Sequence, residues 1–480
     1  MRLTIKNLGI LLAASAAIAC TTQQARIEAD YVFENVNVVP LNEEVVLANK
    51  SVAVRGGEIV AILDQSSAGK IEASIRVDGA GQYLMPGLAD MHIHMRMDPQ
   101  AAFNLFLANG VTTVFNMGLA DRNGDTQIDH LQLRSDVENG RLNGPRYLVS
   151  GPQLHAEELP SLEEVEPMLD LHVEHGYDVI KVHGPLDKDI YDRLIDGAQE
   201  RGLRVTGHAQ QLRPLAHSLR QDAIEHIEEF LYVSRDPAHG KAAAGSLDKY
   251  LKAYFPHAER MSDPEYRAPV VREVAESGVY VDPTLIIYKY ILSYISDDLF
   301  AELQSDARLA YLPMRTRDEY MNAETNEYRT GFAKVIGEYL GGEDAVVSHT
   351  ARNVEILAAL VYEMHSAGVP LLLGTDLFGA VVPGFSAHQE LELLVDAGLT
   401  PYEALRTGTV NAAAFLGETD NAGTVEVGKR ADFFLVEANP LADIGNAADV
   451  NGVFSHGKWC SASDLVQMLS EAKKLAGGTE

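Results

Sequence analysis

Both ends of the chain contain short runs in which apolar and polar residues alternate. Three such runs lie between residues 31 and 87 (YVFENVNVVP, SVAVRGGEIVAIL and SIRVDGAGQYLMPG), and two more follow residue 422 (GTVEVGKRADFFLVEANP and NGVFSHGKW). A period of two is typical of strands that bury one face, and Arg55-Gly56-Gly57-Glu58 predicts a hairpin turn. We therefore expect one small β-sandwich domain built from residues 31–85 and 418–465.

The middle of the chain alternates short apolar runs with amphipathic helical stretches such as KDIYDRLIDGAQERG. The predicted strands are residues 88–94, 112–117, 145–149, 179–183, 204–208, 223–227, 279–283 and 370–374. Eight strand–helix units predict an α/β fold, a (β/α)8 TIM barrel over residues 86–417. An open doubly wound sheet is the alternative, and the count of eight favours closure.

Two connections of this predicted barrel are long, residues 230–264 after the sixth strand and residues 284–342 after the seventh. Both follow strands, so both belong to the carboxyl face of the barrel, where active sites lie. Lids or walls of a substrate pocket are the favoured interpretation, and plain surface insertions are the alternative.

Polar side chains that bind metals recur at the ends of the predicted strands. The stretch ADMHIHM places His92 and His94 on one face of a strand, which by itself leaves metal ligation and structural burial equally open. The full set is His92, His94, Lys181, His208, His226 and Asp376. Six such residues at matching strand ends are hard to explain as separate buried polar groups, because each would need its own hydrogen-bond partners.

The order of these motifs resembles the amidohydrolase superfamily, with the greatest similarity to bacterial Xaa-Pro dipeptidases, arginine carboxypeptidases and related periplasmic amidohydrolases. The resemblance runs from residue 31 to about residue 459. It is carried by LMPGLADMHIHM, GVTTVFNMG, DVIKV, GHA, AIEH, GVPLLLGTD, LTPYEALRTGTVNAAAFLG and GTVEVGKRADFFLVEANPL.

The resemblance implies a binuclear metal centre. His92, His94 and Asp376 would bind one divalent ion, and His208 and His226 a second. An ammonium has no lone pair for a metal; in this family carbon dioxide converts the lysine, here Lys181, into a carbamate that bridges both ions. The alternative for Lys181 is an ion pair at the core edge. Nitrogen and oxygen ligands suit Zn²⁺ best, and manganese or cobalt could occupy the same site.

The same resemblance implies hydrolysis of an amide bond in a small peptide or N-acyl amino acid, by attack of a hydroxide that bridges the two metals. Two cations lower the pKa of a shared water from about 15.7 towards 7. Asp376 would take the remaining proton and deliver it to the leaving nitrogen. Asp376 and Lys181 are therefore catalytic candidates, together with His155, which could donate to the carbonyl oxygen or hold substrate.

Other residues near the strand ends carry weaker expectations. Tyr232, Tyr288 and Phe378 follow the sixth, seventh and eighth strands and are candidates to line the substrate pocket, although aromatic residues in long connections more often only pack. His183, two residues after Lys181, is expected to hydrogen-bond behind the site. His388 and Glu390, at the start of the helix after the eighth strand, are expected to have structural roles rather than catalytic ones.

The first residues predict export. Arg2 and Lys6 precede an apolar segment at residues 8–19, which is typical of a secretory signal, and Cys20 follows Ala-Ile-Ala. The pattern resembles a bacterial lipoprotein signal, so we expect a signal peptide at residues 1–19, a lipid on Cys20, a linker to residue 30, and a location in the periplasm or at the outer membrane. Simple cleavage without lipid is the alternative. Cys460 is then the only other cysteine, which leaves no internal disulfide.

The formal net charge of -30 argues against nucleic acid as a partner, because nucleic-acid-binding proteins need basic surface. We expect a small-molecule substrate and a membrane contact only through the lipid. A homo-oligomer is possible. One alternative function is hydrolysis of a cyclic amide, lactone or phosphoester at the same centre. A mononuclear deaminase of the imidazolone or adenosine type is less favoured, because such sites lack the bridging lysine. A non-catalytic surface module is also less favoured, because such proteins lose metal ligands and here all six are present.

Overall fold

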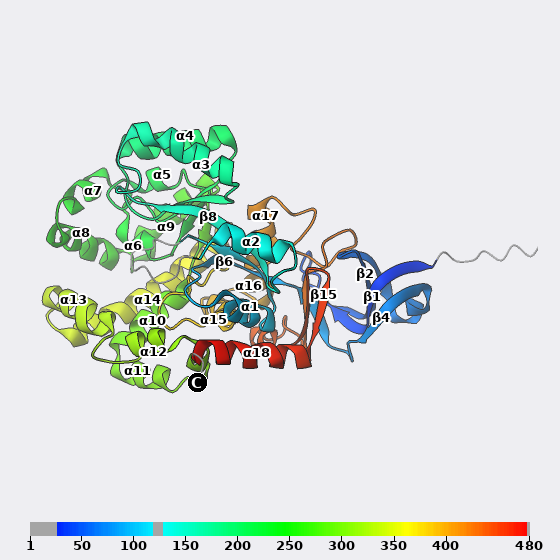
Figure 1. Ribbon diagram of the computed structural model, residues 1–480. Coiled ribbons are helices and arrows are strands. Elements are labelled where there is room, and N and C mark those ends of the chain that lie inside the picture. Colours follow the sequence, from blue (N-terminus) through cyan, green and yellow to red (C-terminus); the bar gives the residue numbers. More distant parts are fainter. Residues whose placement is uncertain (1–25, 119–127, 478–480) are drawn as a thin grey trace, which may run out of the picture.

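The computed structural model describes residues 26–118 and 128–477, and shows a barrel of alternating strands and helices beside a smaller β domain (Figure 1). The predicted signal peptide and Cys20 lie outside the described residues. Among the described helices, none combines the length and the apolar character needed to cross a membrane.

The small domain is built from both ends of the chain, as predicted. Its strands are β1 (Ile27–Val38), β2 (Leu47–Arg55), β3 (Glu58–Asp64), β4 (Ile71–Asp78), β5 (Tyr83–Pro86), β13 (Phe433–Val436), β14 (Val450–Ser455) and β15 (Lys458–Ser461). They form one hydrogen-bonded sheet in the order β15-β14-β13-β5-β1-β2-β3, with β4 paired in parallel to β1. The predicted hairpin turn joins β2 to β3, where Gly56 and Gly57 have φ of 60° and 81°, values that glycine adopts without a Cβ penalty.

The two chain ends meet between β5 and β13, which pair antiparallel with Met85 opposite Phe434. On one face of this sheet, Phe33 of β1 and Phe433 of β13 are both fully buried, and their ring centroids lie 4.9 Å apart at right angles. Edge-to-face contacts of this kind add to the free energy gained from burial alone. The apolar period-two pattern therefore brings two segments some 400 residues apart into one core.

The barrel contains seven parallel strands in the order β12-β11-β10-β9-β8-β7-β6. They are β6 (Leu88–Ile93), β7 (Val111–Asn116), β8 (Arg146–Leu154), β9 (Val179–Val182), β10 (Val205–Gly207), β11 (Ala223–Glu225) and β12 (Tyr280–Asp282). Each begins within a few residues of its predicted position. The sequence pattern therefore located these seven strands correctly.

The predicted eighth strand, residues 370–374, is reduced to a single bridge between Leu371 and Val281. It still nearly closes the barrel, because the Leu372 amide donates to the Val281 carbonyl at 2.9 Å on one side, and Leu373 accepts from the Met91 amide at 2.7 Å on the other. A side chain at Gly374 would collide with Asp282, since a Cβ there would lie 2.1 Å from the Asp282 Oδ2 atom. The close approach of the Asp282 side chain therefore requires glycine at position 374.

The outer layer of the barrel consists of helices that follow the strands. They are α1 (Pro99–Ala108), α2 (His130–Glu138), α3 (Val165–His175), α4 (Lys188–Arg201), α5 (Leu215–Ser218), α9 (Pro264–Ser277), α14 (Glu343–Ser366), α15 (Phe385–Asp396), α16 (Pro401–Thr407) and α17 (Val410–Leu416). A last helix, α18 (Ala462–Gly477), was not predicted. It leaves the small domain after β15 and packs along α1, where Leu465 and Ala472 join the main core (Figure 1).

Both long connections are helical. The first contains α6 (Glu229–Tyr232), α7 (Pro237–Ala243) and α8 (Leu247–Arg260). The second contains α10 (Leu285–Ile295), α11 (Asp297–Gln304), η3 (Ala307–Tyr311), α12 (Met314–Tyr320), the π-helix η4 (Tyr328–Phe332) and α13 (Ala333–Leu340). Figure 1 places α7, α8, α11 and α13 at the opposite end of the molecule from β1, β2 and β4. They therefore stand beyond the carboxyl ends of the barrel strands, where walls of a substrate pocket are expected.

Candidate active site

Six predicted site residues meet at the carboxyl ends of the barrel strands. His92 lies in β6 and His94 follows it; Lys181 lies in β9; His208 and His226 directly follow β10 and β11; and Asp376 follows the eighth segment. Five of these side chains are buried, and His208 is partly exposed. Strand–helix alternation places all strand ends on one face of the barrel, so one mouth collects side chains that are far apart in the sequence.

The cluster is compact. Asp376 Oδ1 lies 3.2 Å from His92 Nε2 and 3.1 Å from His94 Nε2, and these two nitrogens are 3.3 Å apart. Lys181 Nζ lies 3.5 Å from His92 Nε2. The ring centroid of His226 is 4.8 Å from that of His92 and 4.7 Å from that of His208. Nitrogen and oxygen atoms of the cluster thus lie close enough to one another to share bound cations.

Unusual backbone conformations aim two of these side chains. His226 and Asp376 have φ of 68° and 58°, in the left-handed region that residues other than glycine rarely adopt. The amides of Thr375 and Asp376 both donate to the His92 carbonyl, at 3.1 and 2.7 Å, which turns the chain back towards β6. Strain of this kind is common where the surrounding structure holds a functional group in place.

A glycine makes room behind His208. A Cβ at Gly207 would lie 1.8 Å from the Val182 carbonyl oxygen, and Gly207 has φ of 147°. The His208 amide donates to that same carbonyl at 2.9 Å. The close approach of β10 to β9 therefore requires glycine, and it sets His208 beside Lys181.

Outer partners orient three of the imidazoles. Nδ1 of His94 donates to the Gly118 carbonyl at 2.8 Å, and Nδ1 of His208 lies 2.9 Å from Glu229 Oε1. Nδ1 of His226 lies 2.8 Å from the Thr284 hydroxyl. A carbonyl or carboxylate oxygen accepts a proton from Nδ1, which leaves the lone pair on Nε2. Partners of this kind fix the tautomer of metal-binding histidines.

Burial keeps the imidazoles neutral. It lowers the pKa of His208 to about 3 and the pKa values of His92 and His226 well below the usual range. Burial also lowers the pKa of the Lys181 ammonium to about 7, so a neutral amine is accessible near neutral pH. Although burial acts to raise it, the electrostatic interaction with His92 and the hydrogen bonds with His92 and His94 hold the pKa of Asp376 well below its usual range. These are the protonation states that metal ligands require.

Glu225 belongs to the site and was missed by the sequence interpretation. Its carboxylate contacts Lys181 Nζ, accepts from the Thr206 hydroxyl at 2.8 Å, and lies 3.5 Å from His92 Nδ1. It directly precedes His226, and strict alternation would put the two on opposite faces. The left-handed His226 breaks this alternation, so both side chains reach the interior. The only sequence signal was a charged residue inside the apolar strand AIEH.

The donor set fits divalent cations. Within the described residues, two groups offer ligand atoms that lie within 4.8 Å of one another: His92, His94 and Asp376, and His92, Glu225 and His226. In the same residues, His92 Nδ1 is buried without a hydrogen bond, whereas the nearby Glu225 Oε2 is in ion-pair contact with Lys181 Nζ. Buried polar atoms without a partner are costly unless an ion or water completes them. The site therefore has the chemistry of a cation site lined by imidazole and carboxylate.

His155 and His183 form a second layer beside the cluster. His155 follows β8, and its Nε2 lies 2.8 Å from His183 Nδ1, while its Nδ1 lies 3.2 Å from Glu158 Oε2. The His183 ring centroid is 4.4 Å from that of His208. His183 thus stands between His155 and the cluster, so His155 reaches the cluster through another ring.

The three predicted aromatic residues divide into two groups. Tyr232 packs on Tyr254 at 5.2 Å between ring centroids, and Tyr288 accepts a hydrogen bond from Asn353 at 3.1 Å. Phe378 belongs to a different group, with Tyr320 and Tyr328 at 5.9 and 6.2 Å. Both groups contain residues of the long helical connections. These connections therefore supply aromatic walls on two sides.

His388 and Glu390 have the structural contacts that were expected of them. His388 Nε2 donates to the Asn109 carbonyl at 2.8 Å. Glu390 is fully buried and accepts from the amides of Leu285 and Ile286, at 2.9 and 2.8 Å, at the start of α10. Glu390 thereby anchors the helix that carries Tyr288.

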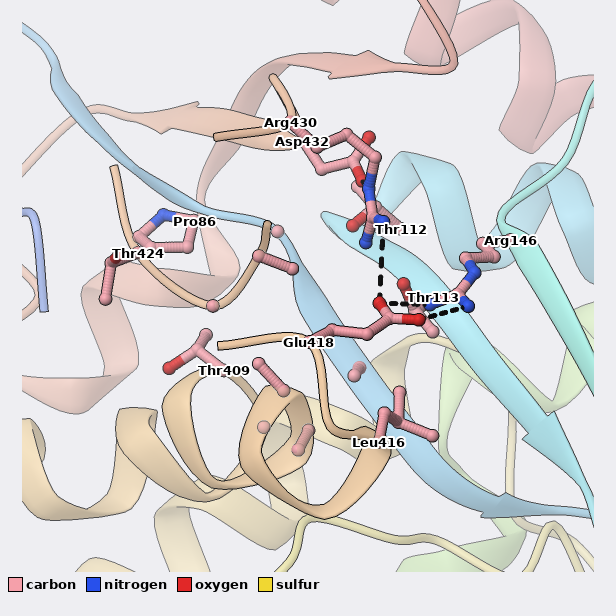
Figure 2. A pocket seen from close by; sticks show the side chains of 17 residues that line it. Pro86, Thr112, Thr113, Arg146, Thr409, Leu416, Glu418, Thr424, Arg430 and Asp432 are labelled. Atoms are coloured by element: carbon pink, nitrogen blue, oxygen red, sulfur yellow. Dashed lines mark hydrogen bonds and ion pairs between the residues drawn. The ribbon is translucent and has the colours of Figure 1, made fainter. Parts of the chain in front are cut away.

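A cavity of about 30 Å³ lies at the opposite end of the barrel from the histidine cluster, where the strands begin (Figure 2). Figure 2 shows Glu418 between two arginines: it accepts two hydrogen bonds from Arg146, at 2.7 and 2.5 Å, and lies 3.5 Å from Arg430. Arg430 also pairs with Asp432. The space suits about one water, and the opposite charges compensate one another. This cavity belongs to the interface between the barrel and the small domain rather than to a substrate site.

Comparison with known proteins agrees with this geometry. The model of the amidohydrolase family matches residues 83–460. The imidazolonepropionase of Geobacillus thermodenitrificans (strain NG80-2) is 24% identical over 423 residues, which is 83% of this chain and 86% of that protein. The imidazolonepropionase of Pseudomonas syringae pv. tomato is 31% identical, but only over 22% of this chain and 30% of its own length.

Solved structures share the fold. A putative prolidase from Bifidobacterium longum is 23% identical, with 92% of this chain and 98% of that chain covered and a TM-score of 0.58. The bottromycin amidohydrolase is 19% identical, with 93% and 90% covered and a TM-score of 0.67. At these identities the likeness shows the architecture of barrel and β domain, and the site must be interpreted from its own residues.

Proposed function

From the premise that this chain belongs to the amidohydrolase family, and so is a hydrolase of amide C–N bonds, we propose that it is a binuclear metal enzyme that cleaves the amide bond of a small peptide or N-acyl amino acid. The observation that carries the proposal is Lys181, a fully buried lysine within 3.5 Å of a buried histidine cluster. Burying a lysine is costly unless its charge is compensated, as the Glu225 carboxylate does for the ammonium, or removed.

Lys181 can be converted into a ligand. A neutral amine attacks carbon dioxide, which forms an N–C bond and releases one proton to solvent, and the product is a carbamate anion with two oxygens. The lowered pKa of Lys181 makes this amine available near pH 7. We propose that the carbamate lies between two sites, one formed by His92, His94 and Asp376 and the other by His208 and His226. Glu225 contacts Lys181 and is placed to orient it.

Divalent cations at these ligands, most suitably Zn²⁺, would lower the pKa of the attacking water and polarise the amide carbonyl. Asp376 is placed to accept a proton from the water as the C–O bond forms, and then to donate it to the leaving nitrogen as the C–N bond breaks. His155, through His183, is placed to orient the substrate beside His208. The helical connections exclude bulk water from this side of the barrel.

Hydrolysis of a cyclic amide is the second candidate. It is supported by the relative named imidazolonepropionase, which covers most of this chain. Lys181 argues against a mononuclear imidazolone-type site, which lacks the lysine, whereas hydrolysis of a cyclic amide at the same binuclear centre is compatible with it.

Metal analysis and a substrate library test the proposal. The zinc-loaded protein should contain about two ions per chain and hydrolyse dipeptides or N-acyl amino acids. A content that stays below one ion after supplementation would contradict the binuclear centre, and turnover of an imidazolone alone would favour the second candidate. Growth with ¹³C-bicarbonate should give a carbamate carbon signal by NMR that disappears in Lys181→Ala.

We also propose that the protein is exported and held at a membrane by a lipid on Cys20. The support is the apolar segment that ends at this cysteine. The Cys20→Ala variant should leave the membrane fraction with its specific activity intact. A wild-type protein that is already entirely soluble would contradict the anchor.

A further inference from the structure

Glu228 is a carboxylate at the carboxyl face of the barrel that the proposed mechanism does not use. It follows His226 by two residues and directly precedes α6. The residue is partly exposed, but its Oε2 atom is buried, and among the described residues nothing donates a hydrogen bond to that atom. A buried carboxylate oxygen is costly unless a donor satisfies it. Glu228 therefore has the capacity to bind a positively charged donor.

The other buried carboxylate oxygens without a hydrogen bond are accounted for. Within the described part of the chain, they belong to Glu225, Asp282 and Asp432. Glu225 and Asp432 each contact a lysine or an arginine, and Asp282 is enclosed in β12 at 1% exposure. Glu228 is thus the partly exposed member of this set that no cation of the described residues compensates.

Glu228 lies near both aromatic walls of the pocket. Burial raises the pKa values of Tyr232, Tyr288 and Tyr328, and the negative charge of Glu228 adds to the rise in each of them. Tyr232 and Tyr288 belong to the first aromatic group and Tyr328 to the second, so the carboxylate interacts with both groups. Tyrosine rings attract cations to their faces. A carboxylate flanked by tyrosines favours an organic cation as its ligand.

The same carboxylate is close to the reacting centre. Burial raises the pKa of Glu228, and the negative charges of Glu229 and Asp376 add to this rise. The charge of Asp376 also adds to the rise in the pKa of Tyr328. Asp376 is the proposed proton carrier, so Glu228 and the second aromatic wall both lie within electrostatic range of the amide to be cleaved. A cation held at Glu228 is therefore expected to be part of the substrate, near its scissile bond.

We propose that Glu228 binds the free α-ammonium group of a dipeptide substrate. This inference rests on the proposed function and selects the unblocked dipeptide over the N-acyl amino acid. In a dipeptide, two bonds of about 1.5 Å each separate the scissile carbon from the ammonium nitrogen, so this charge must lie beside the reacting centre. The cations proposed at the histidines repel an ammonium, and a carboxylate next to it offsets that repulsion. A hydrogen bond between two charged groups is also stronger than one between neutral groups.

Paired substrates test this assignment. A glycyl-amino acid and the N-acetyl derivative of the same amino acid differ only by the ammonium group. The wild type should prefer the glycyl substrate, and Glu228→Gln should lower its kcat/KM about 10- to 100-fold, mainly through KM. For the acetyl substrate, the loss should stay below about threefold. Glu228→Asp should restore part of the loss for the glycyl substrate, because it keeps the charge on a shorter side chain.

Two measurements separate binding from a general effect of the substitution. Metal analysis should find as many ions in Glu228→Gln as in the wild type, because Glu228 is not among the proposed ligands. The matched control is Glu276→Gln at the exposed end of α9, which also removes one negative charge and should change the kinetics of neither substrate.

Several results would overturn the assignment. Equal losses for both substrates, or loss of bound ions in Glu228→Gln, would make Glu228 a structural residue. A wild type that cleaves both substrates equally well would refute the ammonium site while leaving the proposed function intact. A loss that appears only with lysine or arginine as the leaving amino acid would assign Glu228 to that side chain instead. If the wild type cleaves no amide, the proposed function fails, and equilibrium binding of the glycyl-amino acid decides for Glu228: equal affinity in wild type and Glu228→Gln would exclude it.

Discussion

Glu229 should control the affinity of one half of the metal centre, although it touches none of the proposed ions. Its Oε1 lies 2.9 Å from His208 Nδ1, and this is the hydrogen bond that orients the ring. The His208 side chain is 22% exposed, so packing holds it less firmly than the other histidines. Removing the carboxylate in Glu229→Ala should free the ring to rotate and to change tautomer.

The expected size of the effect follows from one hydrogen bond. A bond to a charged group is worth about 1.5–3 kcal/mol, which corresponds to about 10- to 150-fold in an equilibrium constant. Partners behind metal ligands typically contribute 10- to 100-fold. Glutamine keeps an oxygen that can accept from His208 Nδ1 but lacks the charge, so it should retain part of the effect. We therefore expect Glu229→Ala to weaken one ion by about 10- to 100-fold, and Glu229→Gln by less than about tenfold.

Competition with chelators of graded affinity measures both ions in one experiment. The ion at His92 and His94 is the internal control, because the backbone carbonyl of Gly118 orients His94. Gln211→Ala is the matched variant: it removes a neighbour that donates to Glu229 at 3.0 Å but keeps the bond to His208. Glu229→Ala protein that binds two ions within threefold of the wild-type affinities would refute the role of this hydrogen bond.

Four further changes probe the rest of the molecule. Asp376→Asn should keep the ions but lower kcat by about 10²–10⁴-fold, as general acid–base catalysis predicts; near-normal turnover would exclude it as proton carrier. Lys181→Ala should lose ions and activity together, and a short carboxylic acid should restore part of both by replacing the carbamate. Burial raises the pKa of Glu390 from 4.5 to about 8, so the folded state binds the Glu390 proton more tightly than the unfolded state. The free energy of unfolding should therefore fall as pH rises from 4.5 to 8, and the slope should be shallower in Glu390→Gln. Glu418→Ala should lower the free energy of unfolding by about 2–3 kcal/mol, measured with denaturant, and leave kcat/KM unchanged, because its bonds to Arg146 lie at the other end of the barrel.

Local patterns in the sequence were sufficient to predict the seven regular barrel strands and to group the six predicted site residues. Period-two alternation at both ends predicted the small domain, and strand–helix alternation predicted seven barrel strands. That alternation sends every strand end to one face, so His92, Lys181 and Asp376 could be grouped without knowing any distance. Local chemistry decides such features, because each depends only on a few neighbouring residues.

Contacts between distant segments could not be derived in this way. Glu225 reaches the cluster only because His226 is left-handed, and Glu229 and Thr284 matter only through atoms that the fold brings to His208 and His226. The eighth segment keeps only one bridge to Val281 and one backbone hydrogen bond to Met91, and no local pattern separates it from the seven regular strands. Sequence period determines which face a residue occupies, whereas the partner it meets there depends on packing between segments hundreds of residues apart, and only the tertiary structure decides that.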